Sequence, residues 1–161
     1  MNWDALFYLL NRMDFGVKWK GWLKACITTI HFSVLVNGSS TGFFGSSHGF
    51  RQGDMLSPLL FLLIMEVLSQ ILKKTKESDL RGFHVGPVNS IGVRMSHLLF
   101  ANDTILFYDA SREQLLSIRL ALSCFQAFTD LRVKVGKSEM VPIREVGNID
   151  ALANTLWCKV G

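Results

Sequence analysis

The stretch "SHLLFANDTILFYD", residues 96–109, decides how the chain is expected to fold. Two apolar runs, residues 98–101 and 104–107, flank the pair Asn102-Asp103. Asn and Asp are favoured in turns because they tolerate left-handed backbone angles and their side chains bond the local backbone. The pattern therefore predicts a β-hairpin with Asn102 and Asp103 at its tip.

The composition is that of one globular unit. With 161 residues, 49% of them hydrophobic, the chain has the length of a single domain and enough apolar material for a core. Its formal net charge is +4 and its pI is near 9.1. This balance suits a polyanionic partner, although the sequence has no basic tail.

The cysteines and histidines do not form a metal-binding pattern. Cys26, Cys124 and Cys158 lie far apart and lack the C-x-x-C spacing that gathers thiolates around zinc. We expect them to be buried small hydrophobic residues in a reducing compartment. The four histidines are equally scattered, and we expect them to be solvated or hydrogen-bonded.

Neither secretion nor membrane insertion is predicted. The N-terminal segment "MNWDALFYLL" has no basic region before its short apolar run. The longest apolar run, residues 58–65, stops at Glu66 and is well below the roughly 20 residues needed to cross a bilayer. The expected location is intracellular, nuclear or cytoplasmic, with no membrane partner.

Helical periodicity dominates the first part of the chain. Apolar spacing predicts one helix over residues 2–13, ended by Gly16, and a second over residues 17–29. The inner face of the second helix is expected to consist of Trp19, Trp22, Leu23 and Cys26. Asn37-Gly38 then gives the strongest short signal for a hairpin. Ser57-Pro58 predicts the start of a central helix over residues 59–72, apolar nearly all round.

The second half mixes short strands and helices. Alternating residues predict a β pair over residues 83–85 and 91–95. Ser111 and Gln114 resemble a capping box that opens a helix ending near Phe128. A strand over residues 132–135 and a final helix in the last dozen residues complete the pattern. We therefore expect one α+β unit over residues 1–161.

The segment "GFRQGDMLSPLLF", residues 49–61, is the most specific part of the sequence. Gly49 and Gly53 bracket Arg51-Gln52, so the backbone can approach a ligand closely while a charged and an amide side chain are presented. From the residues alone, the segment is either a ligand-binding loop or a plain connection between a strand and a helix.

These motifs resemble those of one enzyme family. Residues 51–58 match R-Q-G-D-x-L-S-P, a motif of reverse transcriptases encoded by non-LTR, LINE-type retrotransposons, particularly those of plants. "HLLFANDT", residues 97–104, is similar to the family's F-A-D-D-T catalytic turn. "LRVKVGKSEM" resembles the following motif, with Lys137-Ser138 at its lysine and serine, and "NWDAL" resembles the residues just after the first catalytic motif.

The resemblance implies a partial polymerase palm, an antiparallel sheet with a catalytic-type hairpin packed on helices, without fingers or thumb. In this family, RNA-directed DNA polymerases extend a DNA primer on an RNA template with deoxynucleotides. Two Mg²⁺ (or Mn²⁺) ions assist the transfer of the nucleotide to the primer: one activates the attacking oxygen and the other steadies the triphosphate. Three aspartates of the family hold these ions, because the ions prefer charged oxygen ligands.

This sequence departs from the family pattern of catalytic aspartates at two places. The first aspartate of the hairpin pair aligns with Asn102, which leaves Asp103 as the metal ligand of that pair. The first-motif aspartate is expected upstream of Asn2-Trp3. We therefore treat Asn102 as a degenerate catalytic position and expect no useful polymerisation by these residues alone.

Other residues take their roles from the same resemblance. Arg51, Gln52 and Gly53 are expected to contact the template base and the incoming nucleotide, and Lys137 to lie near the triphosphate, although a lysine after Gly136 is also a typical solvated residue. Three functions follow: an inactive polymerase fragment, a non-catalytic nucleic-acid-binding module, or a structural remnant that binds nothing.

Overall fold

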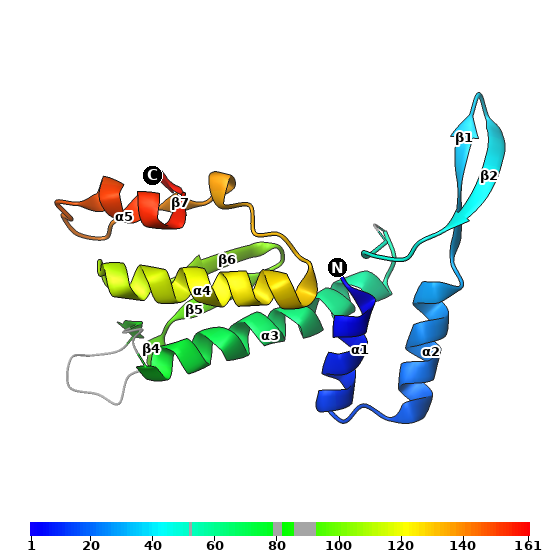
Figure 1. The fold of residues 1–161 in the computed structure, drawn as a ribbon, viewed down its shortest axis with the longest axis horizontal. Helices are drawn as coiled ribbons and strands as arrows, with labels where there is room; N and C mark the ends of the chain where they lie inside the picture. Colours follow the sequence, from blue (N-terminus) through cyan, green and yellow to red (C-terminus); the bar gives the residue numbers. More distant parts are fainter. Residues whose placement is uncertain (52, 79–81, 86–92) are drawn as a thin grey trace. The chain divides into compact units, whose positions relative to one another are not determined.

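The computed structural model describes residues 1–51, 53–78, 82–85 and 93–161 (Figure 1). The chain divides into two compact units, Met1–Phe61 and Leu62–Gly161, and we describe each by itself. Helices alternate with two-stranded sheets, most of them antiparallel, so the predicted α+β class is confirmed at this level. The prediction of a single domain over residues 1–161 stays a prediction.

Two helices open the first unit: α1 (Trp3–Arg12) and α2 (Val17–Thr28). The side chain of Asn2 caps α1 by accepting a hydrogen bond from the Asp4 amide at 2.9 Å. The left-handed residue after α1 is Asp14, with a φ of 57°, and not Gly16, which instead precedes α2. The prediction that Gly16 ends the first helix was therefore wrong.

The inner face predicted for α2 is only partly present. Leu23 is buried, but Trp22 is 67% exposed and Cys26 is exposed. Cys124 is exposed as well, so the expectation of buried cysteines is wrong for two of the three. The aromatic ring of Trp19 stacks on Phe15, with a centroid distance of 4.7 Å, which explains where that side chain finds its contact.

The hairpin predicted at Asn37-Gly38 is confirmed. Strands β1 (His31–Val36) and β2 (Ser39–Gly45) pair antiparallel, with Val36 opposite Ser39. Both turn residues have positive φ, 49° at Asn37 and 80° at Gly38, as the favoured two-residue turn requires. A register irregularity between Phe32 and Val34 interrupts the pairing.

The long helix α3 (Leu56–Ser78) begins before and ends after the range predicted for it. Ser57 and Pro58 lie inside its first turn, and the Ser57 hydroxyl donates to the Asp54 carboxylate at 3.3 Å. The helix is not buried all round, because Leu59 and Leu62 are each 59% exposed. Its buried residues follow one face: Ser57, Leu60, Ile64, Met65, Leu68, Ser69 and Leu72.

By length and composition, one helix among the described residues could cross a membrane. Its window, Leu56–Thr75 in α3, has a mean hydropathy of 1.7, and 39% of it is buried. The core helix of a soluble protein passes the same test, so this single helix is weak evidence for a membrane span.

Two short hairpins follow in the second unit. β3 (Phe83–Val85) and β4 (Val93–Met95) pair antiparallel, as predicted, while the turn predicted between them lies outside the described residues. β5 (His97–Phe100) and β6 (Asp103–Leu106) form the second pair. The hairpin expected from residues 96–109 is thus present.

Helix α4 (Arg112–Thr129) begins after Ser111, as predicted, but without the capping box. The Ser111 hydroxyl donates to the Glu113 carboxylate at 2.5 Å, and this hydrogen bond lowers the pKa of Glu113. The side-chain oxygen of Gln114 instead accepts from the Asp109 amide at 3.0 Å. Gln114 is buried, so it fixes the segment that enters the helix.

The C-terminal segment is more irregular than predicted. Residues 132–135 do not form a strand, because the Val133 amide donates to the side chain of Gln126 at 3.0 Å; a short 3-10 helix, η1 (Val135–Lys137), follows. Helix α5 (Ile149–Leu156) is the predicted final helix. It is followed by β8 (Lys159–Val160), which pairs parallel with β7 (Glu139–Met140).

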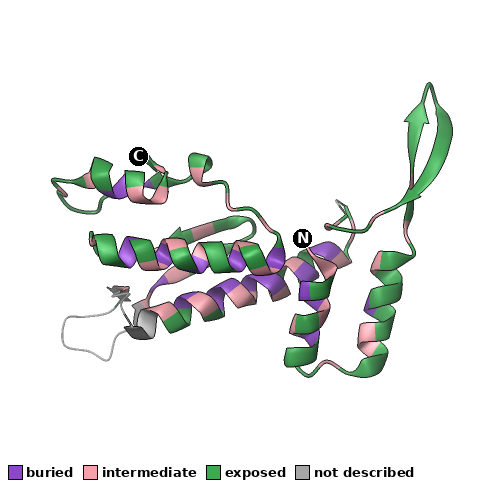
Figure 2. Cartoon of the chain, viewed as in Figure 1, coloured by how far each residue is buried: buried purple, intermediate pink, exposed green. Residues whose placement is uncertain are grey.

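A hydrophobic cluster holds this end of the second unit together. It consists of Leu115, Met140, Leu152 and Ala153, with Tyr108, Val146, Ile149, Leu156 and Cys158 packed against it. Between α4 and the end of α5, the Arg119 guanidinium lies 3.7 Å from the centroid of the Trp157 ring. Figure 2 shows a buried stripe along α4, with half-buried and exposed residues on the rest of the helix.

Candidate functional site

The first candidate site is the loop between β2 and α3. Arg51 is exposed there, and Gln52 lies outside the described residues. Gly53 has a φ of 82°, a left-handed conformation that strains any other residue. The Asp54 amide donates to the Arg51 carbonyl at 3.5 Å, so the loop turns tightly before α3.

Aromatic rings of the β1–β2 hairpin lie beside this loop. The Arg51 guanidinium carbon is 5.9 Å from the centroid of Phe32, within the range of a cation–π contact. Phe32 stacks in turn on Phe44, with centroids 5.8 Å apart and planes inclined by 29°. The three side chains therefore form a continuous row of one cation and two rings.

Hydrogen bonds tie the same loop to the N-terminus of the unit. The indole Nε1 of Trp3 donates to the Gly49 carbonyl at 3.0 Å, and the Gly49 amide donates to the Met1 carbonyl at 3.1 Å. A small cavity of about 60 Å³ lies at this junction. Its lining includes Trp3, Phe32, His48, Arg51 and Asp54.

The second candidate site is the tip of the β5–β6 hairpin. Phe100 pairs with Asp103, so the two turn residues are Ala101 and Asn102. Asp103 is the first residue of β6 and does not belong to the turn, contrary to our expectation. The left-handed residue is Ala101, with a φ of 48°, where we had expected Asn or Asp. All four residues of the tip are exposed to solvent.

The base of this hairpin is held by a histidine between two serines. The Nε2 atom of His97 lies 2.9 Å from the Ser69 hydroxyl, and its Nδ1 atom lies 3.0 Å from the Ser96 hydroxyl. Both serines are buried, so these hydrogen bonds are sheltered from water. The Phe107 amide also donates to the Ser96 carbonyl at 2.8 Å, which closes the hairpin below its strands.

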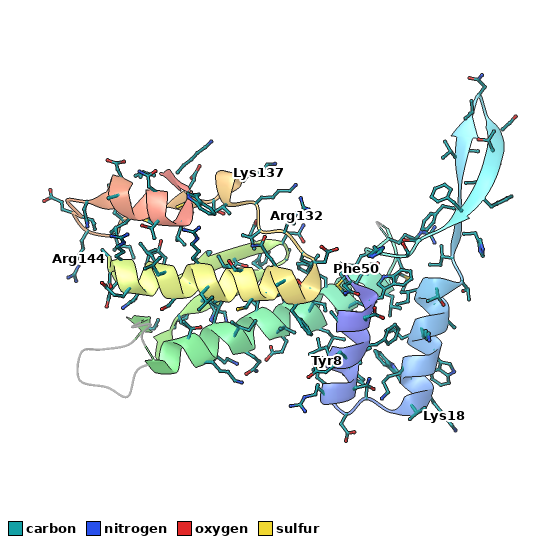
Figure 3. The ribbon with its side chains drawn as sticks, in the orientation of Figure 1. Tyr8, Lys18, Phe50, Arg132, Lys137 and Arg144 are labelled. Atoms are coloured by element: carbon teal, nitrogen blue, oxygen red, sulfur yellow. The ribbon has the colours of Figure 1, made fainter. Side chains whose placement is uncertain are left out.

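Lys137 is the last residue of η1 and is exposed (Figure 3). The amides of Lys137 and Ser138 donate to the carbonyls of Lys134 and Val135, both at 2.9 Å, so the backbone of this corner is fixed. Figure 3 shows the Lys137 side chain leaving η1, with Arg132 on the preceding segment.

Residues 1–149 match the family described as reverse transcriptase (RNA-dependent DNA polymerase). The chain belongs to the reverse transcriptase family. The match contains both candidate sites, so the resemblance drawn from residues 51–58 and 97–104 is confirmed at the level of the family.

A shorter match links this reverse transcriptase chain to a plant protein. An uncharacterised mitochondrial protein of Arabidopsis thaliana is 44% identical over 77 residues, which are 46% of this chain and 61% of that protein. The chain thus matches less than two thirds of the relative's own length.

The described residues of this reverse transcriptase chain do not fit a metal cage. Nowhere in residues 1–51, 53–78, 82–85 and 93–161 do three His, Cys, Asp or Glu side chains gather in a way that could hold an ion. Asp103 supplies a carboxylate at the hairpin tip, and Asn102 beside it supplies an uncharged amide. Magnesium sites depend on charged oxygen ligands, so we derive no catalytic step through a metal here.

Sequence reasoning missed the residues that surround Arg51 in this reverse transcriptase chain. Phe32 and Phe44 lie in the predicted hairpin around Asn37-Gly38 but were given no binding role, and His48 was treated as a scattered histidine. The aromatic content of the β1–β2 hairpin was the available signal. This aromatic content does not by itself predict which rings lie together, because the irregularity after Phe32 changes which side chains share a face of the hairpin.

Proposed function

We propose that the chain is a fragment of a non-LTR, LINE-type reverse transcriptase of the plant type, and that it covers most of the palm. The support is the order of three motifs within the family match: R-Q-G-D-x-L-S-P at residues 51–58, F-A-N-D-T at residues 100–104, and Lys137-Ser138. The mixture of helices with small antiparallel sheets agrees with this assignment.

In this proposal the fragment has no polymerase activity as it stands. The observation that carries this conclusion is the exposed pair Asn102-Asp103 on the β5–β6 hairpin, where the family pattern has two aspartates. A unit charge pair near 4 Å is worth about 4 kcal/mol at an effective dielectric of about 20. Because about 1.36 kcal/mol changes a rate tenfold, the loss of one ligand charge corresponds to a turnover that is lower by roughly a thousandfold.

The remaining roles follow the family pattern and are part of the same proposal. Arg51, Gln52 and Gly53 contact the template base and the deoxynucleotide, Lys137 lies near the triphosphate, and the partners are an RNA template and a DNA primer. Mg²⁺ or Mn²⁺ belongs to the intact family site. An intracellular location, nuclear or cytoplasmic, without a membrane, completes the proposal.

A primer-extension assay tests the inactivity. The chain is incubated with an RNA template, a DNA primer, deoxynucleotides and either Mg²⁺ or Mn²⁺, beside Asp103→Ala as the matched control. We expect equal, background incorporation by both chains. Incorporation by the unsubstituted chain clearly above the Asp103→Ala variant contradicts the proposal.

A restoration experiment tests the substitution at position 102. Asn102→Asp alone is expected to stay at background. The same substitution, in a chain extended at its N-terminus by a family strand that ends in aspartate, is expected to gain incorporation over the extended chain with Asn102. If Asn102→Asp gives no gain in the extended chain, the residue at position 102 is not what limits activity.

A second candidate function is nucleic-acid binding without catalysis. It is favoured by the exposed Arg51 guanidinium, which lies over the Phe32 ring; Phe32 in turn stacks on Phe44. Binding of a primer–template should weaken with salt, and Arg51→Ala should weaken it further and reduce the salt dependence. Arg144→Ala, an exposed arginine of the other unit, is the matched control. No binding of any nucleic acid supports the third reading, a structural remnant.

A further inference from the structure

The base of the β1–β2 hairpin carries an open hollow that the family motifs do not explain. It is lined by Phe32, Phe44, Gly45, Ser46, Ser47 and His48. All six residues belong to the first unit, so the hollow is complete within it. It lies at the end of β2 and in the segment that leads to Arg51.

The size of the hollow suits a small aromatic ligand group. Its volume is about 420 Å³, and it is a shallow depression open to solvent, which can receive one face of a flat group. The neighbouring cavity of about 60 Å³ is much smaller. The hollow of the hairpin base is therefore the better candidate for a bound group.

Its wall is aromatic and accessible. Phe32 and Phe44 face one another across the two strands and stack, and Phe44 is still 54% exposed. Figure 2 shows that most of this hairpin is exposed. Each exposed ring face offers a planar surface of the kind on which nucleobases stack.

The polar side of the hollow is preorganised by its own serines. The Ser46 hydroxyl donates to the His48 carbonyl at 2.7 Å, and the Ser47 hydroxyl lies 2.8 Å from His48 Nδ1. The Ser47 contact orients the imidazole ring, and the Ser46 contact holds the backbone of His48. Within the part of the chain that the structure describes, the Nε2 atom of His48 has no hydrogen-bond partner and remains available to a ligand.

The positive charge beside the hollow comes from Arg51, whose guanidinium lies 5.9 Å from the Phe32 ring. The six residues that line the hollow include no acidic side chain. Asp54 lines the neighbouring small cavity, and its carboxylate accepts a hydrogen bond from Ser57. A phosphate beside the stacked base would therefore meet a guanidinium and an imidazole, and no carboxylate from the lining of the hollow.

We propose that this hollow binds an unpaired base of single-stranded nucleic acid, stacked on Phe44, with the adjoining phosphate toward Arg51 and His48. The inference rests on the proposed function, because a reverse transcriptase fragment has nucleic acid as its partner. It adds a binding site outside the R-Q-G-D-x-L-S-P motif. An unpaired base is required because pairing and stacking in a duplex hide the base faces that the ring would contact.

Fluorescence anisotropy with the full chain tests this site. The probes are a fluorescein-labelled 12-mer of riboadenylate, the same length of deoxyriboadenylate, and a blunt duplex. Phe44→Ala is expected to weaken single-strand binding by about five- to hundredfold, as is typical for the loss of one stacked base. Phe44→Trp should keep the affinity, because it retains a ring.

The two single-stranded probes are then compared. Equal affinity for both indicates stacking without recognition of the sugar, and a preference for riboadenylate indicates an RNA strand; both outcomes support the site.

The matched control is the neighbouring ring. Phe43 is 78% exposed and, as the adjacent residue in β2, points to the opposite face of the hairpin. Phe43→Ala should change single-strand affinity less than twofold. Circular dichroism of both variants checks that each is as folded as the parent chain.

Three outcomes overturn the inference. One is an equal effect of Phe43→Ala and Phe44→Ala on single-strand affinity; another is a duplex affinity that equals the single-strand affinity and falls equally with Phe44→Ala. The third is the absence of single-strand binding. If the chain then still binds a primer–template through Arg51, only the stacking site fails. If it binds neither, the nucleic-acid partner of the proposed function fails too.

Discussion

The two best-formed hairpins of the molecule, β1–β2 and β5–β6, reach the same two-residue connection by different means. Asn37 and Gly38 both have positive φ, and both residue types adopt it readily. At the second hairpin the positive φ belongs to Ala101, a residue that adopts this conformation at a cost of about 1–2 kcal/mol.

The difference extends to how each hairpin is held. The strands of β1–β2 are exposed along most of their length, including Leu35 at 71% and Phe43 at 78%. The strands of β5–β6 alternate between exposed and half-buried residues, and His97 anchors their base between two buried serines. The first hairpin thus follows from its turn sequence, whereas the second keeps an unfavourable turn because its base is fixed.

The largest expected loss of stability comes from removing His97, which anchors the base of the β5–β6 hairpin. His97→Ala removes the partner of two buried hydroxyls, Ser69 and Ser96, and should lower the free energy of unfolding by about 2 kcal/mol. Urea titration followed by circular dichroism measures the loss.

The matched histidine of the first hairpin is His31. It is exposed, and its Nδ1 atom lies 3.0 Å from the Thr29 carbonyl. His31→Ala should change the free energy of unfolding by less than about 0.5 kcal/mol. Equal losses in the two variants would show that the base of β5–β6 is not a special anchor.

The next largest loss of stability is expected at the Asn37-Gly38 turn of the β1–β2 hairpin. Gly38 has a φ of 80°, and a Cβ atom there would meet nothing within 4 Å. Gly38→Ala therefore introduces backbone strain without a clash, and should destabilise the hairpin by about 1 kcal/mol. Hydrogen exchange of the β1 and β2 amides should become roughly fivefold faster.

The control for this glycine is Gly45, in the same hairpin. Its φ is not left-handed, and its position is equally open. Gly45→Ala should leave the exchange rates nearly unchanged. Similar acceleration by both substitutions would assign the effect to a general loss of glycine and not to the turn.

The same contrast separates what the sequence could predict from what it could not. Asn37-Gly38 encodes its turn locally, and the apolar runs around residue 102 predict a hairpin there, so both hairpins were found. The assignment of Ala101 to the left-handed position was missed, because turn propensity favours Asn and Asp. The register that pairs Phe100 with Asp103 decides it, and this register is a property of the whole hairpin.

Burial was the least predictable property. Helical spacing places Trp22 and Cys26 on the same face of α2 as Leu23, but only Leu23 is buried. Similarly, residues 132–135 have a strand-like composition, yet the Val133 amide bonds to the side chain of Gln126. Periodicity identifies which residues share a face and says nothing of which partner, if any, covers it.

A further effect, confined to alkaline pH, should distinguish the segment that follows β6. Burial, and to a lesser degree the charge of Cys158, raises the pKa of Tyr108 from 10.0 to about 12. The neutral phenol is therefore favoured in the folded chain, and the stability it contributes is complete below pH 10 and is lost as the pH rises from 10 toward 12.

Urea titrations between pH 9 and 12 measure this loss, and Tyr108→Phe should make it shallower. Desolvation also raises the pKa of Cys158, so its thiol adds to the same alkaline loss and Cys158→Ala is the necessary comparison. If Tyr108→Phe leaves the alkaline slope unaltered, the phenol is ionised as readily in the folded chain as in the unfolded one.

The smallest expected effect is the most direct test of strain at the β5–β6 tip. Ala101→Gly relieves the left-handed conformation but adds conformational freedom to the unfolded chain, so the net change should be a few tenths of a kcal/mol. Ala101→Val, with a branched side chain at the same φ of 48°, should destabilise by more than about 1 kcal/mol. Thermal melts of the two variants beside the parent chain measure both changes. If glycine destabilises as much as valine, the Cβ atom of Ala101 contributes packing, and the turn is not strained. If glycine is neutral and valine costly, the tip that presents Asn102 and Asp103 is kept in place by the anchored strands, against the preference of its own residue.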